Sequence, residues 1–496
     1  MTGNRAPVLG VFAVLSILGA GIYGHGIHGP FLYDDVSCIV ENTTIQSIGG
    51  ALRTFGDPNA LSSGGFNYFN YRPLLPVVYA FVYALFGLAP PAYHVLNIVL
   101  HIFTGLALFL LIRRVTGGGN MVAFLATVLW FIHPTHVESV ESISGTDDIL
   151  CGLFLISTIL LVLRRRWILA LIVYALALTS KELAVVGPAM VFAAVYVDRD
   201  EALPARLKAA LLAAIPFGVF AAAFWIARTS VMTPRHSGSP VQGLTDVFFV
   251  APKVFLTYLR LLLFPVDLRI NYFFEIVHRI DTAFVVGWLA ISAVAVAFVV
   301  ALRRAQIVAF GLAWFAVTYL PVSNVLPIRA LAAERFMYLP FAGLAIVAAV
   351  GIAKLERHKT RLVALSVAIV ALWSALSFAR VHVWNDEELF WKDIIAKEPG
   401  FAGYQMYENN LALYYLNAKR FDEALALFSK LYQQDSDNTR TAHNYAQLLL
   451  MQKQYAEAAP IYQGLIKALP NNAVVAQQYT FVMGQVTEPA APDPGK

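Results

Sequence analysis

The sequence predicts an all-helical, polytopic membrane protein with about eleven transmembrane helices, followed by a polar module of helical repeats. Hydrophobic residues make up 58% of the 496 residues and charged residues only 14%, and the mean hydropathy is +0.64. These values lie outside the range of soluble globular proteins. Apolar stretches long enough to span a bilayer recur along the first three quarters of the chain. From residue 405 the composition turns polar and a motif repeats.

The first apolar stretch, 7–24, follows the single basic residue Arg5. Its glycine-rich end is a poor cleavage region and further spans follow, so we expect an uncleaved signal anchor. A stretch at 247–266 is predicted to be re-entrant or interfacial, because counting it as a span would put later basic clusters on the wrong face. The remaining spans are predicted at 93–112, 121–134, 149–163, 167–180, 183–197, 208–227, 282–302, 306–322, 337–353 and 362–379.

The basic residues sit mostly in short loops between spans and, on this threading, all fall on the side of Arg5. The positive-inside rule then places the N-terminus in the cytoplasm and the C-terminus outside. The formal charge of +5 and the pI of about 9.0 therefore reflect orientation, and no nucleic-acid binding is expected. The polar segments predicted on the outer face are 25–92, 135–148, 180–182, 228–281 and 323–336.

Two further absences narrow the function. The short basic loops contain no glycine-rich phosphate-binding motif, so nucleotide hydrolysis is not expected to supply energy. Cys38 and Cys151 are the only cysteines, so no disulfide framework is predicted.

The C-terminal repeat has a period of 34 residues, since Ala424 corresponds to Ala458 and Phe428 to Tyr462. Small residues at Ala412 and Ala446 also fit this period, which is the tetratricopeptide signature. Two repeats are fewer than an independent solenoid usually needs, so the module is expected to pack on the membrane domain or on a partner. The predicted divisions are a membrane domain at 1–383, a linker at 384–404, repeats at 405–438 and 439–472, a capping helix at 473–483 and a disordered tail at 487–496.

Two adjacent carboxylates, Asp34 and Asp35, stand just beyond the first span. Ionised carboxylates are costly near hydrocarbon, so a pair at the rim of a helical bundle is a functional-site hypothesis, with hydroxyl deprotonation or metal binding as the usual roles. The alternative is a solvated turn after a helix.

The second outer loop also crowds titratable residues at a membrane rim. His133, His136 and Glu138 are candidate metal ligands together with Asp34 or Asp35, but their spacing matches no recognised zinc pattern and Pro134 breaks the helical register. Helix capping and hydrogen bonding at the rim are the favoured interpretation.

Basic residues on the predicted outer face are candidates to bind an anion. Lys181 follows two apolar runs and precedes Glu182, which puts its ammonium near the level of a lipid-linked phosphate. Snorkelling of a long side chain is the alternative. Candidates for the same phosphate, or for pairs with carboxylates, are Arg72, Arg260, Arg329 and Arg335.

Motifs along nearly the whole chain together resemble one family. They are Phe31-Leu32-Tyr33-Asp34-Asp35, Asn70-Tyr71-Arg72-Pro73-Leu74, Tyr93-His94-Val95-Leu96-Asn97 with His101, His133-Pro134-Thr135-His136-Val137-Glu138, Ser180-Lys181-Glu182 and Ala333-Glu334-Arg335-Phe336-Met337-Tyr338-Leu339-Pro340. With the C-terminal repeats, they look like the transmembrane and tetratricopeptide O-mannosyltransferase family. This resemblance implies a C-type glycosyltransferase (GT-C) fold and an inverting enzyme that uses a polyprenyl-phosphate sugar on the outer face. The chain has fewer repeats than the animal members, which favours a bacterial-type member with another sugar or acceptor.

The resemblance also implies roles for single residues. An aspartate of the first outer loop acts as the base, and by position that role passes to Asp34 or Asp35, with Asp34 the first choice. The resemblance places Lys181 and Arg335 near the donor phosphate, and Arg260 is a further candidate ligand from its position in the sequence. The substrate-binding candidates are Arg72, His94, His136, Glu138 and Glu182.

The predicted reaction transfers a sugar from a polyprenyl phosphate to a Ser/Thr hydroxyl of an extracytoplasmic protein that the repeats recruit. A monophosphate leaving group carries little charge, so Lys and Arg are expected to suffice without a cofactor. If a divalent metal does bind, Asp34, Asp35 and Glu138 are the candidate ligands. The expected location is a bacterial inner membrane with the site facing the periplasm, or the endoplasmic reticulum with the site facing the lumen.

Two other function classes are open from sequence. A non-catalytic membrane scaffold would present the repeats to an extracytoplasmic partner, and changes at Asp34 would then be silent. A lipid or ion transporter would carry buried charges at the bilayer midplane and inverted repeats between its halves. Neither feature is evident by inspection of the sequence.

Overall fold

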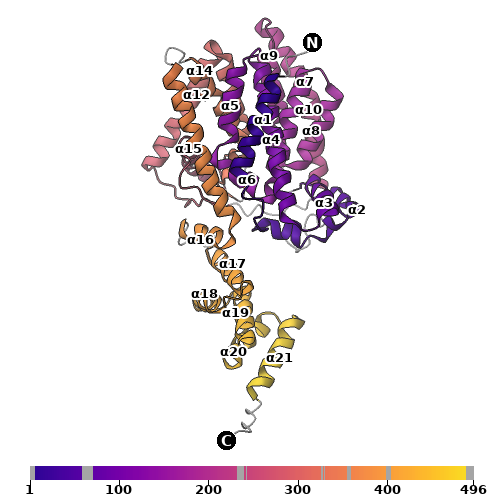
Figure 1. Cartoon of the computed structure of the whole chain (residues 1–496), viewed down its shortest axis with the longest axis vertical. Helices are drawn as coiled ribbons and strands as arrows, with labels where there is room; N and C mark the ends of the chain where they lie inside the picture. The colour runs from indigo at the N-terminus through magenta and orange to yellow at the C-terminus, as the bar shows by residue number, and fades with distance from the viewer. Residues whose placement is uncertain are drawn as a thin grey trace. The chain divides into compact units, whose positions relative to one another are not determined.

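The computed structural model describes residues 6–57, 71–231, 240–241, 243–325, 328, 330–354, 359–397 and 404–487. Contacts divide the chain into two compact units, Met1–Asp386 and Glu387–Lys496, and both are helical (Figure 1). The division falls close to residue 384, where the sequence predicts a linker. Much of that linker range is itself helical, because α16 (Glu387–Lys397) lies within it and packs against α17 of the second unit.

Among the described residues of the first unit, six helices are long and apolar enough to cross a membrane. A seventh candidate is a pair of helices, Asn120–Phe131 and Pro134–Glu141, bent by 56° at a short break. The long helices are α1 (Ala6–Tyr23), α4 (Pro90–Val115), α7 (Thr146–Leu163, extended back to Ile143), α10 (Leu203–Val231), α12 (Thr282–Arg304) and α15 (Lys359–Asn385).

Shorter helices fill the bundle between the long ones. They are α2 (Ile48–Leu52), α3 (Leu74–Phe86), α5 (Asn120–Phe131), α6 (Val137–Glu141), α8 (Trp167–Ser180), α9 (Gly187–Asp198), α11 (Leu244–Leu263), α13 (Gln306–Tyr319) and α14 (Pro340–Lys354). Each stretch predicted as a span overlaps one of the helices, so the multi-pass helical architecture is confirmed. The count of eleven crossings stays a prediction, because α8, α9, α13 and α14 are short for a full span.

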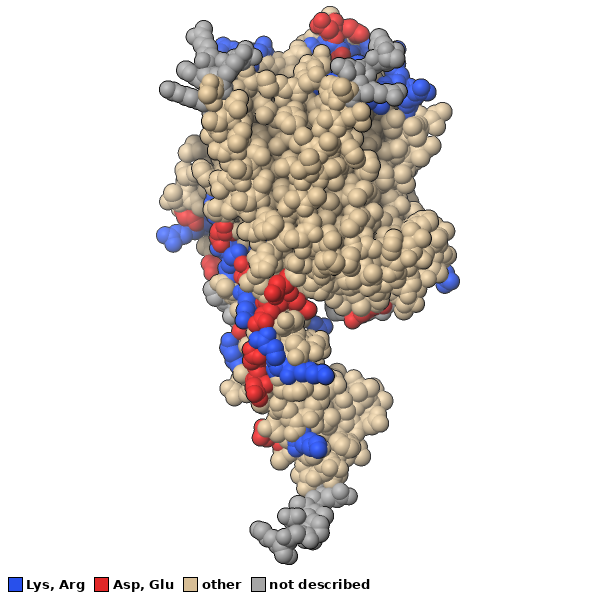
Figure 2. Space-filling model, viewed as in Figure 1, with Lys and Arg blue, Asp and Glu red and all other residues tan. Residues whose placement is uncertain are grey.

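The first unit has the charge distribution that a bilayer requires. Figure 2 shows that, on the face in view, Lys, Arg, Asp and Glu gather toward the two ends of the helical bundle and leave an uncharged band between them. Such a band suits contact with lipid hydrocarbon, in which exposed charges are costly. The chain is therefore a multi-pass membrane protein.

Helix α11, predicted as re-entrant or interfacial, is amphipathic. Val254, Tyr258 and Leu261 are buried against the bundle, whereas Leu244 and Phe248 are exposed. Lys253 on the same helix pairs with Asp281 at 2.6 Å, which also caps the N-terminus of α12. The helix packs along α12, and its two-faced pattern differs from the uniform apolarity of the long spans.

Helices α13 and α14 pack with almost no space at one crossing. A Cβ added to Gly343 would lie 2.3 Å from the carbonyl oxygen of Gly311 and 2.6 Å from the backbone nitrogen of Phe315. Since both neighbours are backbone atoms, they cannot move aside as a side chain would. Only glycine therefore fits at this crossing, directly after the segment that carries Arg335.

Replacing Gly343 with Ala is expected to destabilise the protein by about 1–3 kcal/mol, because the added methyl group overpacks the helix crossing. The measurement is the thermal unfolding midpoint in detergent. Gly351→Ala on the same helix is the matched control, since nothing lies within 4 Å of the added Cβ there. Equal midpoints for the two variants would show that the crossing tolerates the methyl group.

The second unit consists of antiparallel helix pairs. Its elements after α16 are α17 (Tyr404–Asn417), α18 (Phe421–Gln434), α19 (Thr439–Met451), α20 (Tyr455–Ala468) and α21 (Ala473–Thr487). The four alanines singled out by the repeat, Ala412, Ala424, Ala446 and Ala458, are completely buried, which allows the close helix approach expected of them. Of the predicted tail, Thr487 is the last residue of α21 and residues 488–496 lie outside the described residues.

Candidate active site

The two aspartates of the first outer loop have different surroundings. The buried carboxylate of Asp35 accepts hydrogen bonds from the backbone N–H groups of Leu32 at 3.2 Å, Ser144 at 2.7 Å and Ile143 at 3.4 Å. Burial raises the pKa of Asp35 to about 7, although these hydrogen bonds oppose the shift. Asp35 thus ties the first loop to the turn before α7.

Asp34, one residue earlier, is exposed, and no hydrogen bond to its carboxylate is found among the described residues. The protein around it still removes enough water to raise the pKa of Asp34, while Arg335 and Arg72 oppose that increase and Asp147 and Glu138 add to it. An accessible carboxylate therefore faces two arginines and two further carboxylates. Such a concentration of charges is typical of a functional site and not of an isolated surface turn.

The first turn of α7 supplies two carboxylates, Asp147 and Asp148, which are both buried. Lys181, at the break between α8 and the short 3₁₀ helix Glu182–Val186, points its ammonium at them. Its Nζ lies 2.6 Å from Asp148 Oδ1 and 3.4 Å from Asp147 Oδ1. The helix N-terminus also favours negative charge at this position.

Arg72 connects Asp147 to the next segment. Its guanidinium pairs with Asp147, and its Nε donates to Glu182 Oε2 at 3.1 Å. The Arg72 side chain is 23% exposed, against 5% for Asp147. Arg72 therefore reaches from the buried carboxylates to the accessible surface of the site.

Arg335 closes the site from the C-terminal half of the first unit. It lies on the 3₁₀ helix Glu334–Met337, where its backbone N–H donates to Glu138 Oε2 at 2.8 Å and its guanidinium pairs with Glu138 Oε1. Glu138 is buried, whereas the Arg335 side chain is 30% exposed. Like Arg72, Arg335 is anchored on a buried carboxylate and accessible at its other edge.

The segment before Arg335 is fixed by further hydrogen bonds. Ala333 donates its N–H to the hydroxyl of Tyr258 at 3.0 Å, and the buried carboxylate of Glu334 accepts from the Tyr272 hydroxyl at 2.9 Å. Burial raises the pKa of Glu334 to about 8, although Arg380 nearby opposes the shift. These contacts hold the backbone that presents Arg335.

We refer to these residues together as the charged cluster. Its carboxylates outnumber its cations, and its members come from segments far apart in sequence. The carboxylates are Asp34, Glu138, Asp147, Asp148 and Glu182, and the cations are Arg72, Lys181 and Arg335.

Three predicted site residues lie elsewhere. His94 is buried and donates to the carbonyl oxygen of Gly29, 3.2 Å away. His136 is buried among aromatic rings, with centroids 5.1 Å from Trp130 and 5.0 Å from Tyr338. Arg260 is exposed on α11 and forms none of the ion pairs found among the described residues. The structure brings none of these three into the charged cluster, and Arg329 lies outside the described residues.

Asp147 and Asp148 were not among the site residues that the sequence predicts. They repeat the feature that singles out Asp34 and Asp35, namely two adjacent aspartates at the end of an apolar span. They lie at the end of the predicted outer loop 135–148, directly before the span at 149–163. Paired acids at the end of a span are thus the sequence signal that both pairs share.

The described residues contain no group of three or more His, Cys, Asp or Glu side chains arranged to hold a metal ion. Of the candidate metal ligands predicted from the sequence, Asp35 accepts hydrogen bonds from backbone N–H groups, and Glu138 accepts a hydrogen bond from Arg335. Metal independence stays a prediction.

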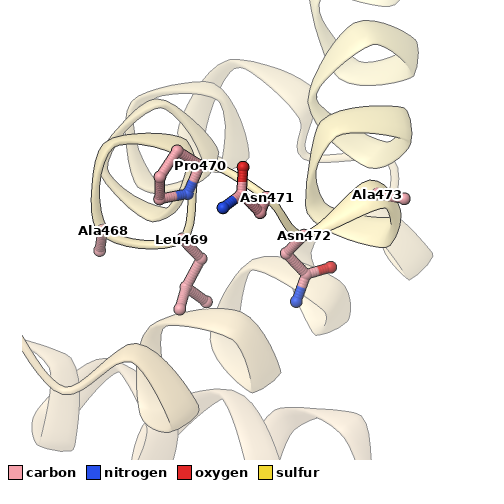
Figure 3. Close-up of a pocket in the computed structure, with 6 residues that line it drawn as sticks. All are labelled: Ala468, Leu469, Pro470, Asn471, Asn472 and Ala473. Atoms are coloured by element: carbon pink, nitrogen blue, oxygen red, sulfur yellow. The ribbon is translucent and has the colours of Figure 1, made fainter.

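A hollow of about 540 Å³ lies at the turn between α20 and α21 in the second unit (Figure 3). Asn472, one of the residues lining it, accepts hydrogen bonds from the N–H groups of Val474 at 3.1 Å and Val475 at 3.2 Å, which caps α21. The lining contains no charged side chain, so the hollow has no group suited to acid–base chemistry. It is lined by Ala468, Leu469, Pro470, Asn471, Asn472 and Ala473.

Fold and site together define a multi-pass helical membrane protein with a partly buried charged cluster and a C-terminal repeat unit. A family model described as a tetratricopeptide repeat matches residues 415–477, which confirms the repeat.

Curated relatives extend the similarity over most of the chain. Protein O-mannosyl-transferase F38B6.6 of Caenorhabditis elegans is 24% identical over 78% of this chain. Protein O-mannosyl-transferase TMTC3 of Mus musculus is 23% identical over 95%, and Tmtc3 of Drosophila melanogaster is 21% identical over 87%. The resemblance that the motifs predict, to the transmembrane and tetratricopeptide O-mannosyl-transferases, is confirmed. The alignments cover 58%, 56% and 56% of these relatives, so the chain matches little more than half of their length.

Among solved structures, ArnT from Cupriavidus metallidurans bound to undecaprenyl phosphate covers 97% of this chain, and 76% of the ArnT chain is covered. Sequence identity is 16% and the TM-score is 0.41, a similarity too weak to carry an inference.

Proposed function

We propose that the protein is a membrane glycosyltransferase of GT-C architecture. In this proposal it transfers a sugar, mannose or another hexose or pentose, from a polyprenyl phosphate to a Ser/Thr hydroxyl of a protein on the extracytoplasmic face. The names and the extent of the relatives support a glycosyltransferase.

The observation that carries the proposal is the position of Asp34. It is an exposed carboxylate with a raised pKa, next to arginines that are themselves fixed on buried acids. A general base needs access to its substrate and a pKa moved toward neutrality. Asp34 meets both conditions, whereas Asp35 is buried and its oxygens already accept backbone hydrogen bonds.

The proposed reaction is a single inverting displacement. Asp34 removes the proton of the acceptor hydroxyl while the hydroxyl oxygen forms a bond to the anomeric carbon. The bond between that carbon and the phosphate oxygen breaks, and the electron pair leaves with the polyprenyl phosphate. The exposed edges of Arg72 and Arg335 would bind the phosphate oxygens and stabilise the charge that develops on them.

The repeat unit gives the acceptor a place to bind in this proposal, since tetratricopeptides commonly bind peptides and proteins. The orientation argued from the basic loops puts the charged cluster and this unit on the outer face of the membrane. Protein acceptors presented there would meet the lipid-linked donor at the membrane surface.

The test compares intact masses of extracytoplasmic proteins from cells that contain the protein and from cells in which its gene is deleted. The expected result is one or more proteins that lack a hexose or pentose in the deleted cells and regain it on complementation. Identical masses in both cells would overturn the proposal and favour a scaffold.

Because the phosphate is to be bound by arginines, we expect transfer in isolated membranes to continue at an unchanged rate in excess EDTA. The same membranes should show no increase after addition of Mg²⁺ or Mn²⁺. A large loss of activity in EDTA that either ion restores would contradict the expectation and direct attention to the carboxylates of the charged cluster.

A further inference from the structure

Lys181 was predicted to bind the donor phosphate, but its ammonium is already occupied. Its side chain is 9% exposed, and two of its N–H groups point at carboxylate oxygens of Asp148 and Asp147. A phosphate would have to displace one of these partners and leave a buried carboxylate without a counter-charge, which is strongly unfavourable. Arg72 and Arg335 are two to three times more exposed.

Asp147 is shared between two cations. One oxygen, Oδ1, lies 3.4 Å from Lys181 Nζ, and the other, Oδ2, pairs with the guanidinium of Arg72. Asp148 is adjacent in the chain, equally buried, and paired with Lys181 at 2.6 Å. Among the cations of the charged cluster, only Lys181 therefore pairs with both of these neighbouring buried carboxylates.

Removing the ammonium of Lys181 would change which carboxylates the guanidinium of Arg72 compensates. Arg72 would become the nearest cation for Asp147 and Asp148 together, and an arginine drawn toward two buried acids presents less of itself to a ligand. Its second partner, Glu182, holds the guanidinium from the other side at 3.1 Å. Through the shared partner Asp147, Lys181 thus affects how much of the Arg72 guanidinium stays accessible to a ligand.

We infer that Lys181 is a positioning residue: it supplies a counter-charge to both Asp147 and Asp148 and thereby leaves Arg72 available for the donor phosphate, without contacting the phosphate itself. The inference rests on the proposed function as far as the phosphate is concerned. The pairing of Lys181 with Asp147 and Asp148 does not depend on the substrate. An experiment can therefore test this pairing separately from the proposed function.

The experiment uses the full-length protein in detergent with Lys181→Met, Asp148→Asn and the double variant. Lys253→Met is the control, because Lys253 also pairs with an aspartate, Asp281 at 2.6 Å, outside the charged cluster. Two quantities are measured for each variant: the affinity for undecaprenyl phosphate without sugar, and the thermal unfolding midpoint.

We expect Lys181→Met to weaken undecaprenyl phosphate binding and to lower the midpoint, and the double variant to regain about tenfold in affinity together with most of the midpoint. Coupled neighbours show recoveries of this size. A lysine that binds phosphate directly predicts the same loss with no recovery in the double variant, which would overturn the inference. An unchanged affinity in Lys181→Met would overturn it as well, since Arg72 would then not depend on Lys181.

Asp148→Asn alone keeps the test decisive where the lysine variants fold poorly. In this variant Lys181 keeps its other partner, Asp147, so its ammonium is not released and no gain in affinity is expected. A gain of tenfold or more would show that Lys181, once released, binds the phosphate. If wild-type protein binds no polyprenyl phosphate at all, the proposed function fails, while recovery of the midpoint in the double variant still tests the charge balance.

Discussion

Replacing Asp34 with Asn is expected to reduce sugar transfer by about 10²–10⁴-fold, the usual contribution of a general base. The substitution keeps the size of the side chain and removes only its ability to take a proton. Asp34 is exposed and no hydrogen bond to its carboxylate is found among the described residues, so folding should be unaffected. The measurement is initial transfer rate in membranes, normalised to the amount of folded protein.

Asp35→Asn is the matched control because the two aspartates are adjacent but only Asp35 is buried and accepts backbone hydrogen bonds. An amide at position 35 would direct one N–H₂ group toward backbone N–H donors, so the expected result is a lower unfolding midpoint. Full activity in Asp34→Asn would show that Asp34 is not the base. Loss of activity in Asp35→Asn with an unchanged unfolding midpoint would instead indicate that Asp35 is the base.

The raised pKa of Asp34 gives this prediction a pH dependence. The base works in its ionised form, so transfer should increase as the pH rises through the pKa of Asp34, which lies above the ordinary value of 3.8. In the absence of Asp34 that acid limb should disappear from the small residual rate. An identical acid limb in Asp34→Asn would assign it to another group.

The second large effect is expected at Arg335. Arg335→Met removes the cation that most strongly lowers the pKa of Asp34, and also one of the two arginines proposed to bind the donor phosphate. Loss of one such electrostatic contact usually costs about 10²–10³-fold in rate. The KM for the donor should rise, and the acid limb should move to higher pH because Asp34 loses the positive charge that most strongly favours its ionised form.

Arg335→Lys separates charge from geometry. It keeps a positive charge opposite Glu138 but loses the planar, two-pronged donor, so part of the rate should return and the acid limb should move back. Arg114→Met is the control, since Arg114 pairs with Asp198 at 2.8 Å outside the cluster. An acid limb that stays in place in Arg335→Met would show that Arg335 does not act on Asp34.

Much of the fold follows from the sequence because the signals are local. An apolar run long enough to cross a bilayer predicts a helix with few alternatives, and the buried alanines of the second unit follow from a period of 34 residues. Local sequence patterns do not predict the 56° bend before α6, nor the helix α16 within the predicted linker.

The charged cluster could be predicted only in part. Asp34, Arg72, Lys181 and Arg335 stand out as polar residues at span ends, and the structure brings them together. Pairing depends on three-dimensional packing, so the sequence does not say that Lys181 faces Asp148 or that Arg335 faces Glu138. The same limit applies to histidines. The sequence marks His136 as a candidate ligand but does not show that aromatic rings surround it.

The pairing of Glu138 with Arg335 spans 197 residues of sequence, and this has a consequence for biogenesis. Membrane helices enter the bilayer in order during synthesis, so Glu138 is inserted long before its arginine has been translated. Until then the acid must be hydrated or covered by the insertion machinery. A nascent chain that stops short of residue 335 carries an uncompensated acid, a feature by which cellular quality control can distinguish unfinished copies from complete ones.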